Sequence, residues 1–350
     1  MMSIFKSLVI KEALHIVRDR RTMVITLLMP VVLLLLFGFA ISTEVNDVRI
    51  VAVVDRHNDL TRNILERLQV NEYFTFQGLT TAGEVEGLLR SGHTDAALLL
   101  RTDDGVLKSQ IIIDASNTTS AQAATAYIQG VINNASSVSP VLTSTLYNPQ
   151  MKSAYNFVPG ILGMIFILIC AIMTSVSIVR EKETGTMNLL LVSPIRGSTI
   201  ILGKLVPYFI LSCAILAIML LISYGVLGMP VSANIVNVIL ISLLYIILSL
   251  SIGLFVSTLA DTQLTALIVS AVMFMLPVIM LSGMIFPIEN MPRLLQYVSC
   301  IIPARWYIEA MRKLMVQQLG IDFIIQETVI LISMTALLLL FSIRKFNSVK

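Results

Sequence analysis

Four charged residues stand in succession at positions 180–183, within the stretch VREKETGTMNLLLVSP (residues 179–194). Residues 153–179 before them and residues 205–260 after them contain no Asp, Glu, Lys or Arg. Lys and Arg alone would orient a membrane protein, because acidic residues contribute little to orientation. The interleaved glutamates Glu181 and Glu183 therefore indicate a docking face, where charged groups give a partner its register and specificity.

The segment GSTIILGKL, residues 197–205, has glycines and a lysine in the order of a phosphate-binding loop. It has five residues between the glycines instead of four, and Leu205 stands where a Ser or Thr would bind magnesium. The sequence before it does not indicate a strand. We therefore expect this chain to bind no ATP, magnesium or other cofactor by itself.

Other side-chain chemistry is sparse. Cys170, Cys213 and Cys300 form no disulfide or metal-ligand pattern, and His57 and His93 have no ligand-like neighbours. The apolar segments contain no nucleophile with a base and no paired acids, which disfavours an intramembrane enzyme. They also lack Asp, Glu and Arg apart from Glu327, whereas an ion-coupled carrier normally needs an ionisable residue inside the membrane. External energy input is thus favoured over proton or sodium antiport.

Composition indicates a membrane protein with one polar domain. The chain is 56% apolar and 13% charged, against about 45–50% and about 25% for soluble domains. Residues 43–155 hold 8 Lys/Arg and 12 Asp/Glu, whereas the rest is rich in long uncharged runs. The basic residues lie beside these runs and form no single basic face, so we expect no nucleic-acid partner.

Six apolar segments meet or approach the length of about 20 residues that a membrane-crossing helix needs. They are residues 22–42, 156–179, 200–227, 233–259, 264–286 and 324–343. Lys and Arg cluster before the first, between the second and third, and after the last, which places these three groups on the cytoplasmic side. Both termini are then cytoplasmic and residues 43–155 lie outside. Residues 287–323 depart from this rule, because they carry Arg293, Arg305, Arg312 and Lys313 on the outer side.

The polar segment 43–155 has the pattern of a mixed α/β domain. Apolar runs predict strands at residues 48–54, 95–100 and 109–115, and helical spacing predicts helices at residues 59–70, 81–92 and 114–136. The N-terminal residues 3–20 form a basic amphipathic pattern, with Phe5, Leu8, Val9, Ala13, Ile16 and Val17 on one face and Lys11, His15 and Arg18 opposite. Such a helix lies in the membrane interface, as an anchor or as a surface for a cytoplasmic partner.

REKETGTMNLLLVSPIRGSTIILGKLVPY (residues 180–208) resembles the cytoplasmic signature of type-2 ABC exporter permeases, the membrane-spanning subunits of ATP-driven exporters. That signature has a charged Arg-Glu-x-Glu-x-Gly-Thr, a short apolar helix, a Ser/Thr-Pro turn and a Gly-Lys that opens the next span. Residues 11–38 and 281–320 are similar to two further segments of the family. The large domain between the first two spans resembles its drug-export-like branch.

The resemblance implies a dimeric pathway of two permease chains, identical or related, with a dimer of separate ABC ATPase subunits beneath, which would bind ATP and magnesium. Substrates would be hydrophobic or amphipathic, such as drug-like molecules or lipids, and a periplasmic adaptor would be a further partner. The ATPase-contacting residues carried over from the family are Arg180, Glu181, Lys182, Glu183, Gly185, Thr186 and Pro194, with Lys11 and Arg18 of the N-terminal helix.

In the family, the segment before the last span forms short re-entrant helices that gate the outer exit. The corresponding residues here are Pro287, Pro292, Pro303, Arg305 and Arg312. Trp306 and Tyr307 fit this reading and fit equally a role as interfacial anchors. A re-entrant segment lined by protein would also explain the four basic residues on the outer side.

We therefore expect a polytopic α-helical protein of the inner membrane, with six transmembrane helices, an extracytoplasmic α/β domain between helices 1 and 2, and re-entrant helices before helix 6. The expected divisions are an interfacial helix (1–21), a first span (22–42), the outer domain (43–155), a bundle of the remaining spans (156–343) with a coupling loop (180–199) and a re-entrant segment (287–323), and a tail (344–350). The alternative is a membrane receptor or scaffold whose outer domain binds a ligand or adaptor.

Overall fold

The two apolar ends of the chain fold together, and the polar segment between them folds by itself. In the computed structural model, Met1–Ile41 and Ser153–Lys350 form the helical unit, and Ser42–Lys152 forms the α/β unit. The structure describes residues 2–40, 48–55, 58–71, 73–91, 93–103, 106–113, 118–135, 153–187, 197–232 and 234–348.

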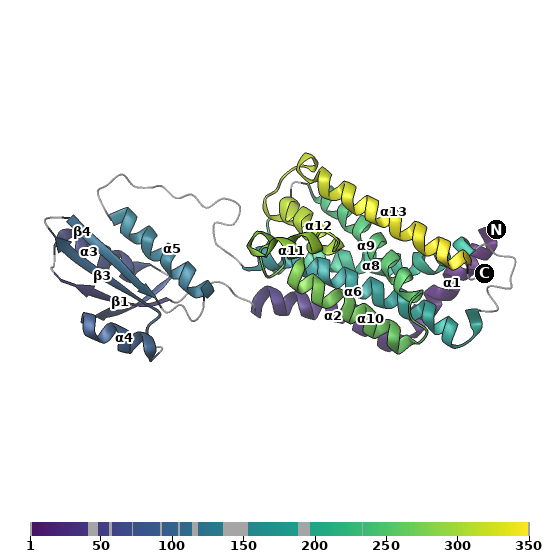
Figure 1. Ribbon diagram of the computed structural model, residues 1–350, viewed down its shortest axis with the longest axis horizontal. Helices are drawn as coiled ribbons and strands as arrows, with labels where there is room; N and C mark the ends of the chain where they lie inside the picture. Colours follow the sequence, from purple (N-terminus) through teal and green to yellow (C-terminus); the bar gives the residue numbers. More distant parts are fainter. Residues whose placement is uncertain are drawn as a thin grey trace. The chain divides into compact units, whose positions relative to one another are not determined.

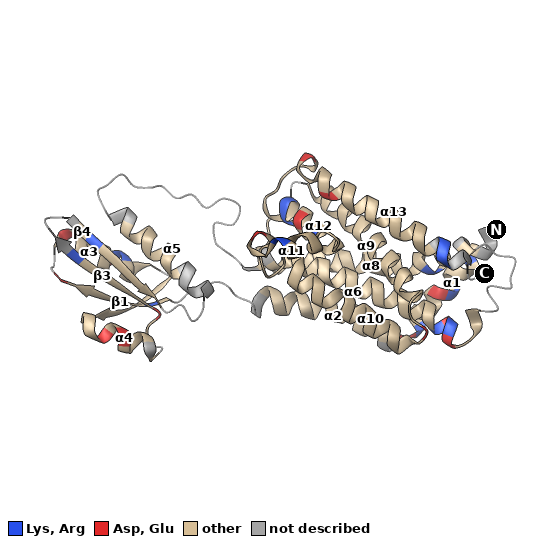
Figure 2. Ribbon diagram, in the orientation of Figure 1, with Lys and Arg blue, Asp and Glu red and all other residues tan. Residues whose placement is uncertain are grey.

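The helical unit consists of long apolar helices that pack side by side (Figure 1). They are α1 (Met2–Arg18), α2 (Arg20–Ala40), α6 (Ser153–Glu183), α8 (Gly197–Gly225), α9 (Ile235–Ser257), α10 (Gln263–Leu281) and α13 (Ile325–Ser348). Five helical segments of the described chain are long and apolar enough to cross a membrane, and the α1–α2 pair, bent by 72°, would make a sixth. Charged residues lie toward the two ends of this unit and are nearly absent from its middle (Figure 2).

Helix α6 lies at the centre of the helical unit and packs against α2, α8, α9 and α10. Its closest neighbour is α9, which meets it at Gly253. A Cβ atom added at Gly253 would lie 2.7 Å from the backbone oxygen of Ala171 and 2.7 Å from Cβ of Thr174. A small residue thus lets the two backbones approach, as is common where helices cross in membranes.

Short helices connect α10 to α13, and three prolines mark their starts. The 3₁₀ turn η1 (Ile288–Asn290) follows Pro287, α11 (Arg293–Ser299) follows Pro292, and α12 (Pro303–Met311) begins with Pro303. Proline suits the first positions of a helix, where no backbone N–H is required. The chain continues from α12 through a π-helix, η2 (Arg312–Val316), and a 3₁₀ turn, η3 (Ile321–Ile324).

The α/β unit is built on a four-stranded sheet of order β2-β1-β3-β4. Its strands are β1 (Val48–Val54), β2 (Phe74–Leu79), β3 (Ala96–Asp103) and β4 (Val106–Ile113), and its helices are α3 (Asp59–Val70), α4 (Ala82–Arg90) and α5 (Thr118–Ala135). The central strand β1 runs parallel to β2 and β3, whereas β4 is antiparallel to β3. One sheet face packs on α3 and α5 around Ile50 and Leu98, and the other packs on α4 around Val51 and Val85.

The strands β1, β3 and β4 and the three helices overlap the segments that the sequence predicts, although β3 extends to Asp103 and β4 begins at Val106. The structure adds β2, which the sequence does not predict. Strand β2 is at the edge of the sheet and is only partly buried. His93 lies on the exposed surface, where its Nδ1 is 2.9 Å from Oγ of Ser91. His57 lies outside the described residues.

Candidate functional site

Helix α6 continues through the charged stretch, so residues 180–183 form its last turn and not the start of a loop. Arg, Glu and Lys are good helix formers, and residues 180–184 include no Gly or Pro. Gly185 has a φ of 74°, and its N–H donates to the carbonyl of Lys182 at 3.1 Å. Glycine adopts this left-handed conformation without strain, which explains why α6 ends here. Pro194 and the rest of the segment 188–196 lie outside the described residues.

Glu181 connects the end of α6 to two other helices. Its Oε1 accepts from Nζ of Lys11 on α1 at 2.9 Å, and its Oε2 lies 3.1 Å from Nζ of Lys204 on α8. Only 9% of Glu181 is exposed. The sequence analysis assigned this carboxylate to a partner subunit, but in this chain it is already paired with two internal lysines. Burying a charge in this way requires such partners.

A second buried carboxylate, Glu12 of α1, completes the cluster. Its Oε1 lies 3.3 Å from Nζ of Lys204 and accepts hydrogen bonds from Oγ of Ser177 at 2.5 Å and from the hydroxyl of Tyr208 at 3.3 Å. Sequence reasoning missed Glu12, although a signal was present. Glu12 is four residues after Leu8 and four before Ile16, so it lies on the apolar face of α1. A carboxylate on such a face needs a buried cation.

The Gly-Lys pair at the start of α8 has a structural explanation in this cluster. A Cβ atom added at Gly203 would lie 3.0 Å from Cβ of Leu8. Gly203 thus lets α1 pack closely on α8, and the next residue, Lys204, then reaches both Glu12 and Glu181. We define the buried ion cluster as Glu12, Glu181 and Lys204 together with Lys11, whose side chain is half exposed at its edge.

Two further charges of the stretch, Lys182 and Glu183, join α6 to the connection between α9 and α10. Nζ of Lys182 donates to the backbone oxygens of Ser257 and, at 3.4 Å, of Ala260. Oε2 of Glu183 accepts from the backbone N of Gln263 at 3.2 Å and from its Nε2 at 2.8 Å. Glu183 therefore stabilises the first turn of α10, where backbone N–H groups lack helical partners.

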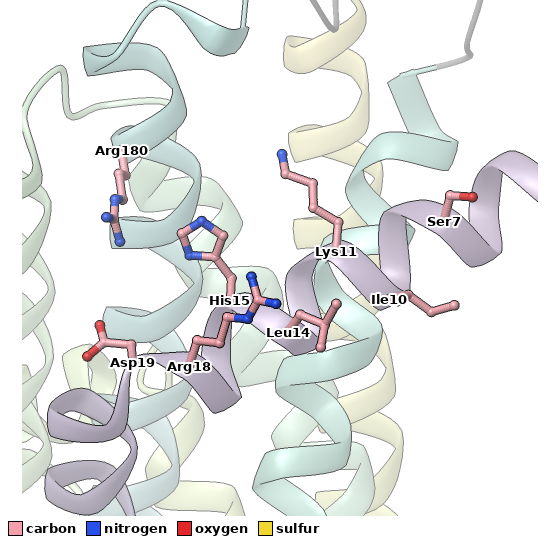
Figure 3. Close-up of a pocket in the computed structure, with 8 residues that line it drawn as sticks. All are labelled: Ser7, Ile10, Lys11, Leu14, His15, Arg18, Asp19 and Arg180. Carbon is pink, nitrogen blue, oxygen red and sulfur yellow. The ribbon is translucent and has the colours of Figure 1, made fainter.

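Arg180 faces α1 across an open groove of about 720 Å³ (Figure 3). Lys11 and His15 point to the side of α1 on which Arg180 lies, whereas Ile10 and Leu14, which also line the groove, point away from Arg180. Thr184, Gly185 and Thr186 are exposed at the end of α6. The lining residues are Ser7, Ile10, Lys11, Leu14, His15, Arg18, Asp19 and Arg180.

The opposite end of the helical unit contains the short helices α11 and α12. Most of α12 is buried, including Trp306 and Tyr307, and it packs against α6, α9 and α13. The ring of Tyr307 stacks on Tyr245 of α9 at 4.1 Å, and its hydroxyl lies 3.0 Å from Oγ of Ser242. Tyr307 is thus a core residue and not an interfacial anchor.

Arg305 and Arg312, two basic residues at this end, donate hydrogen bonds to backbone carbonyls, and Arg305 also donates to a serine hydroxyl. Nη1 of Arg305 donates to the carbonyl of Gln296 at 3.0 Å and to Oγ of Ser299 at 2.5 Å. Nη2 of Arg312 donates to the carbonyl of Gly283 at 2.7 Å. Both guanidinium groups are thus paired with oxygens of the protein itself.

Lys313 and Glu327 form a further ion pair, with Nζ and Oε1 2.5 Å apart. Only 1% of Glu327 is exposed. Burial alone would lower the pKa of Lys313, but the hydrogen bond and the charge of Glu327 raise it. Because Lys313 belongs to the π-helix η2 and Glu327 to α13, the pair links these two elements. Among the described residues, no group of three or more His, Cys, Asp or Glu side chains could hold a metal ion.

Long apolar helices packed in a bundle, with charged residues confined to its ends, are the architecture of a multi-pass membrane protein. Residues 20–344 match the family described as "ABC-2 family transporter protein", and the chain belongs to this family.

Curated relatives agree with this assignment. The chain is 27% identical to "Probable multidrug ABC transporter permease YbhS" of Escherichia coli (strain K12), over 94% of this chain and 95% of that protein. It is 28% identical to "Probable multidrug ABC transporter permease YbhR" of the same organism, over 91% of each chain. It is also 27% identical to "Inner membrane transport permease YhhJ" of that strain, over 61% of each chain. This chain is an ABC transporter permease.

Proposed function

We propose that this chain is the permease subunit of an exporter, which moves hydrophobic or amphipathic molecules such as drugs or lipids outward. Family membership supports the transport function, and the named multidrug permeases support the substrate class. ATP and Mg²⁺ belong to a separate ABC ATPase subunit that docks on the cytoplasmic side. The observation that carries this proposal is the buried ion cluster, because it joins α1, α6 and α8 into one body at the end of the unit that holds both chain termini (Figure 1).

The docking surface is the exposed part of that body. It contains Arg180, Glu183, Gly185 and Thr186 at the end of α6, with Lys11 and Arg18 of α1 beside them (Figure 3). Pro194, which lies outside the described residues, is proposed for the same contact. Glu181 and Lys182 contribute indirectly, because they hold the end of α6 against α1, α8 and the α9–α10 connection. A force applied to this surface by the ATPase would therefore reach several helices together.

In this proposal both termini and the ion cluster lie in the cytoplasm, and the α/β unit lies outside the inner membrane, where it would contact a periplasmic adaptor. The short helices η1, α11 and α12, with Pro287, Pro292, Pro303, Arg305 and Arg312, would gate the outer exit. The hydrogen bonds of Arg305 and Arg312 to backbone oxygens would hold this gate closed.

A second permease chain would complete the pathway. The helix α10 leaves most of its surface exposed, as does α2, and the exposed residues include Leu28, Leu36, Leu267 and Val272. Part of this apolar surface would contact the second chain and the rest would contact lipid. Cysteine cross-linking tests the arrangement in a background without Cys170, Cys213 and Cys300. Leu267→Cys should cross-link two copies, and Leu337→Cys on α13, which is also exposed, should not.

Transport itself is tested with the full chain and its ATPase in proteoliposomes. We expect ATPase-dependent movement of an amphipathic fluorescent dye away from the ATPase side. Thr186→Trp, at the exposed end of α6, should weaken ATPase recruitment without lowering the thermal stability of the permease. Recruitment that is unchanged by Thr186→Trp would contradict the docking surface, and dye movement without the ATPase would contradict the proposed function.

A further inference from the structure

The groove between α1 and the end of α6 has an unusual charge content. Its lining contains three cationic side chains, Lys11, Arg18 and Arg180, together with His15 and a single carboxylate, that of Asp19. The groove is open and about 720 Å³ in volume, which is the size range of small-molecule sites.

Two of these charged groups are already engaged. Nζ of Lys11 is paired with Glu181 at 2.9 Å. The carboxylate of Asp19 accepts hydrogen bonds from the backbone N of Thr22 at 3.2 Å and from its Oγ1 at 2.7 Å. Asp19 attracts Arg180 and His15 only at longer range.

Arg18 and Arg180 remain available for a ligand. Within the described part of the chain, no hydrogen bond or ion pair engages either guanidinium group. The four residues of the buried ion cluster balance one another, so the two arginines exceed the single charge of Asp19. A guanidinium group presents a planar set of donors that matches phosphate oxygens.

The adjoining face of α1, which also lines the groove, is apolar and exposed. Ile10 is 46% exposed, Leu14 is 47% exposed and Val17 is 59% exposed. These residues follow one another at helical spacing, and the exposed apolar residues Val24 and Ile25 of α2 come soon after them in the chain. A soluble acidic partner would match the arginines but would leave this apolar stripe in water. An amphiphile with an anionic headgroup matches both.

We propose that this groove binds the phosphate headgroup of an anionic phospholipid, with Arg18 and Arg180 at the phosphate and an acyl chain along Ile10 and Leu14. The lipid bridges α1 and the end of α6 and adds to the link between Lys11 and Glu181. The lipid site lies beside the proposed ATPase-docking surface, and Arg180 belongs to the lipid site and to the docking surface. Lipid composition would thereby regulate how firmly α1 is held against α6.

Lipid retention by the full-length protein tests this inference with no ATPase present, so its outcome is separate from that of the docking proposal. The protein is purified in detergent with equal amounts of phosphatidylglycerol and phosphatidylcholine, and retained lipid is counted by native mass spectrometry. We expect preferential retention of phosphatidylglycerol, reduced about fivefold for each arginine replaced in Arg18→Gln and Arg180→Gln. Arg344→Gln is the matched control, because Arg344 is exposed and basic but does not line the groove.

A second variant separates the lipid from a free phosphate. Ile10→Ser combined with Leu14→Ser keeps both arginines, and it should reduce retention of phosphatidylglycerol. Size-exclusion profiles verify that each variant is folded. Equal retention of the two lipids, or equal losses in Arg344→Gln and the groove variants, would overturn the proposal. It would also be overturned if glycerol 3-phosphate displaced the lipid at equal concentration, because the site would then recognise phosphate without the lipid.

Discussion

Nζ of Lys204 lies 3.1 Å from Oε2 of Glu181, and these side chains are only 8% and 11% exposed. The pair joins the end of α6 to the start of α8, and Glu12 adds α1 from the opposite end of the sequence. Glu181 therefore has a structural role inside the permease. Loss of transport on its removal would not by itself demonstrate contact with an ATPase.

Glu181→Ala should destabilise the permease itself. Breaking a buried ion pair costs about 3–5 kcal/mol when the remaining charge is left unpaired, and the loss here should be smaller because Lys204 keeps Glu12 as its counter-ion. The thermal midpoint in detergent should fall, and Glu181→Gln combined with Lys11→Gln should recover part of the loss because Lys204 and Glu12 then balance each other. If Glu181→Ala lowers ATPase recruitment without changing the thermal midpoint, the carboxylate acts on the partner and not within the chain.

Glu183 can be tested against its own hydrogen-bond partner. Glu183→Ala removes both bonds to Gln263, whereas Gln263→Ala removes only the side-chain bond at 2.8 Å. If Glu183 acts by positioning the start of α10, both variants should reduce coupled ATPase activity in the same direction, Gln263→Ala less strongly. A defect confined to Glu183→Ala would instead indicate direct contact with the ATPase.

Gly253→Ala should severely disturb the contact between α6 and α9. The added Cβ would meet the backbone of Ala171, which cannot move as a side-chain tip can. Overpacking of this kind costs about 1–3 kcal/mol. Gly225→Ala serves as the control, because nothing lies within 4 Å of its added Cβ. Folded yield and thermal midpoint in detergent should fall only for Gly253→Ala, and equal behaviour of the two variants would contradict the packing.

Lys313→Met should leave the buried Glu327 without its cation and destabilise the outer end of α13 by about 3–5 kcal/mol. Glu327→Leu introduced into the same protein should restore most of the thermal midpoint. Lys313→Arg should retain the pair and serve as the conservative control. An additive loss in the double variant would show that the two residues do not interact.

The α/β unit should lose stability in acid through Asp95. Hydrogen bonds from Arg49, whose Nη2 lies 2.7 Å from Oδ1, lower the pKa of Asp95 below its ordinary value of 3.8. A group with a lowered folded pKa stabilises the fold above its unfolded pKa, and that contribution is lost as the pH falls through the folded pKa. The free energy of unfolding of residues 42–152, measured with urea, should thus decline as the pH falls below 3.8.

Asp95→Asn should reduce stability at neutral pH and flatten this decline. Asp59→Asn, with no ion pair in the described structure, should leave the slope unchanged. If the free energy of unfolding falls with pH equally in Asp95→Asn and in the wild-type protein, other groups cause the decline.

Local sequence features were sufficient for the long apolar helices, the polar insertion and the prolines that begin the short helices. Hydropathy and helical spacing are properties of neighbouring residues, so they can be read without the fold. The same reasoning missed β2, because a short, half-exposed edge strand containing Gly78 carries little hydrophobic signal. It also ended α6 too early, since charge was taken to mark a loop when these residues are good helix formers.

The sequence by itself determined that charge is excluded from the spans and concentrated at positions 180–183. It could not determine what those charges bind. Lys11 and Glu181 are 170 residues apart, and Lys204 and Glu12 are 192 residues apart. Only the packing of α1, α6 and α8 brings them within ion-pair distance, because Gly203 permits the close approach that places Lys204 between two carboxylates. The charged stretch is thus an internal junction of three helices, and its exposed end is where we propose that the ATPase docks.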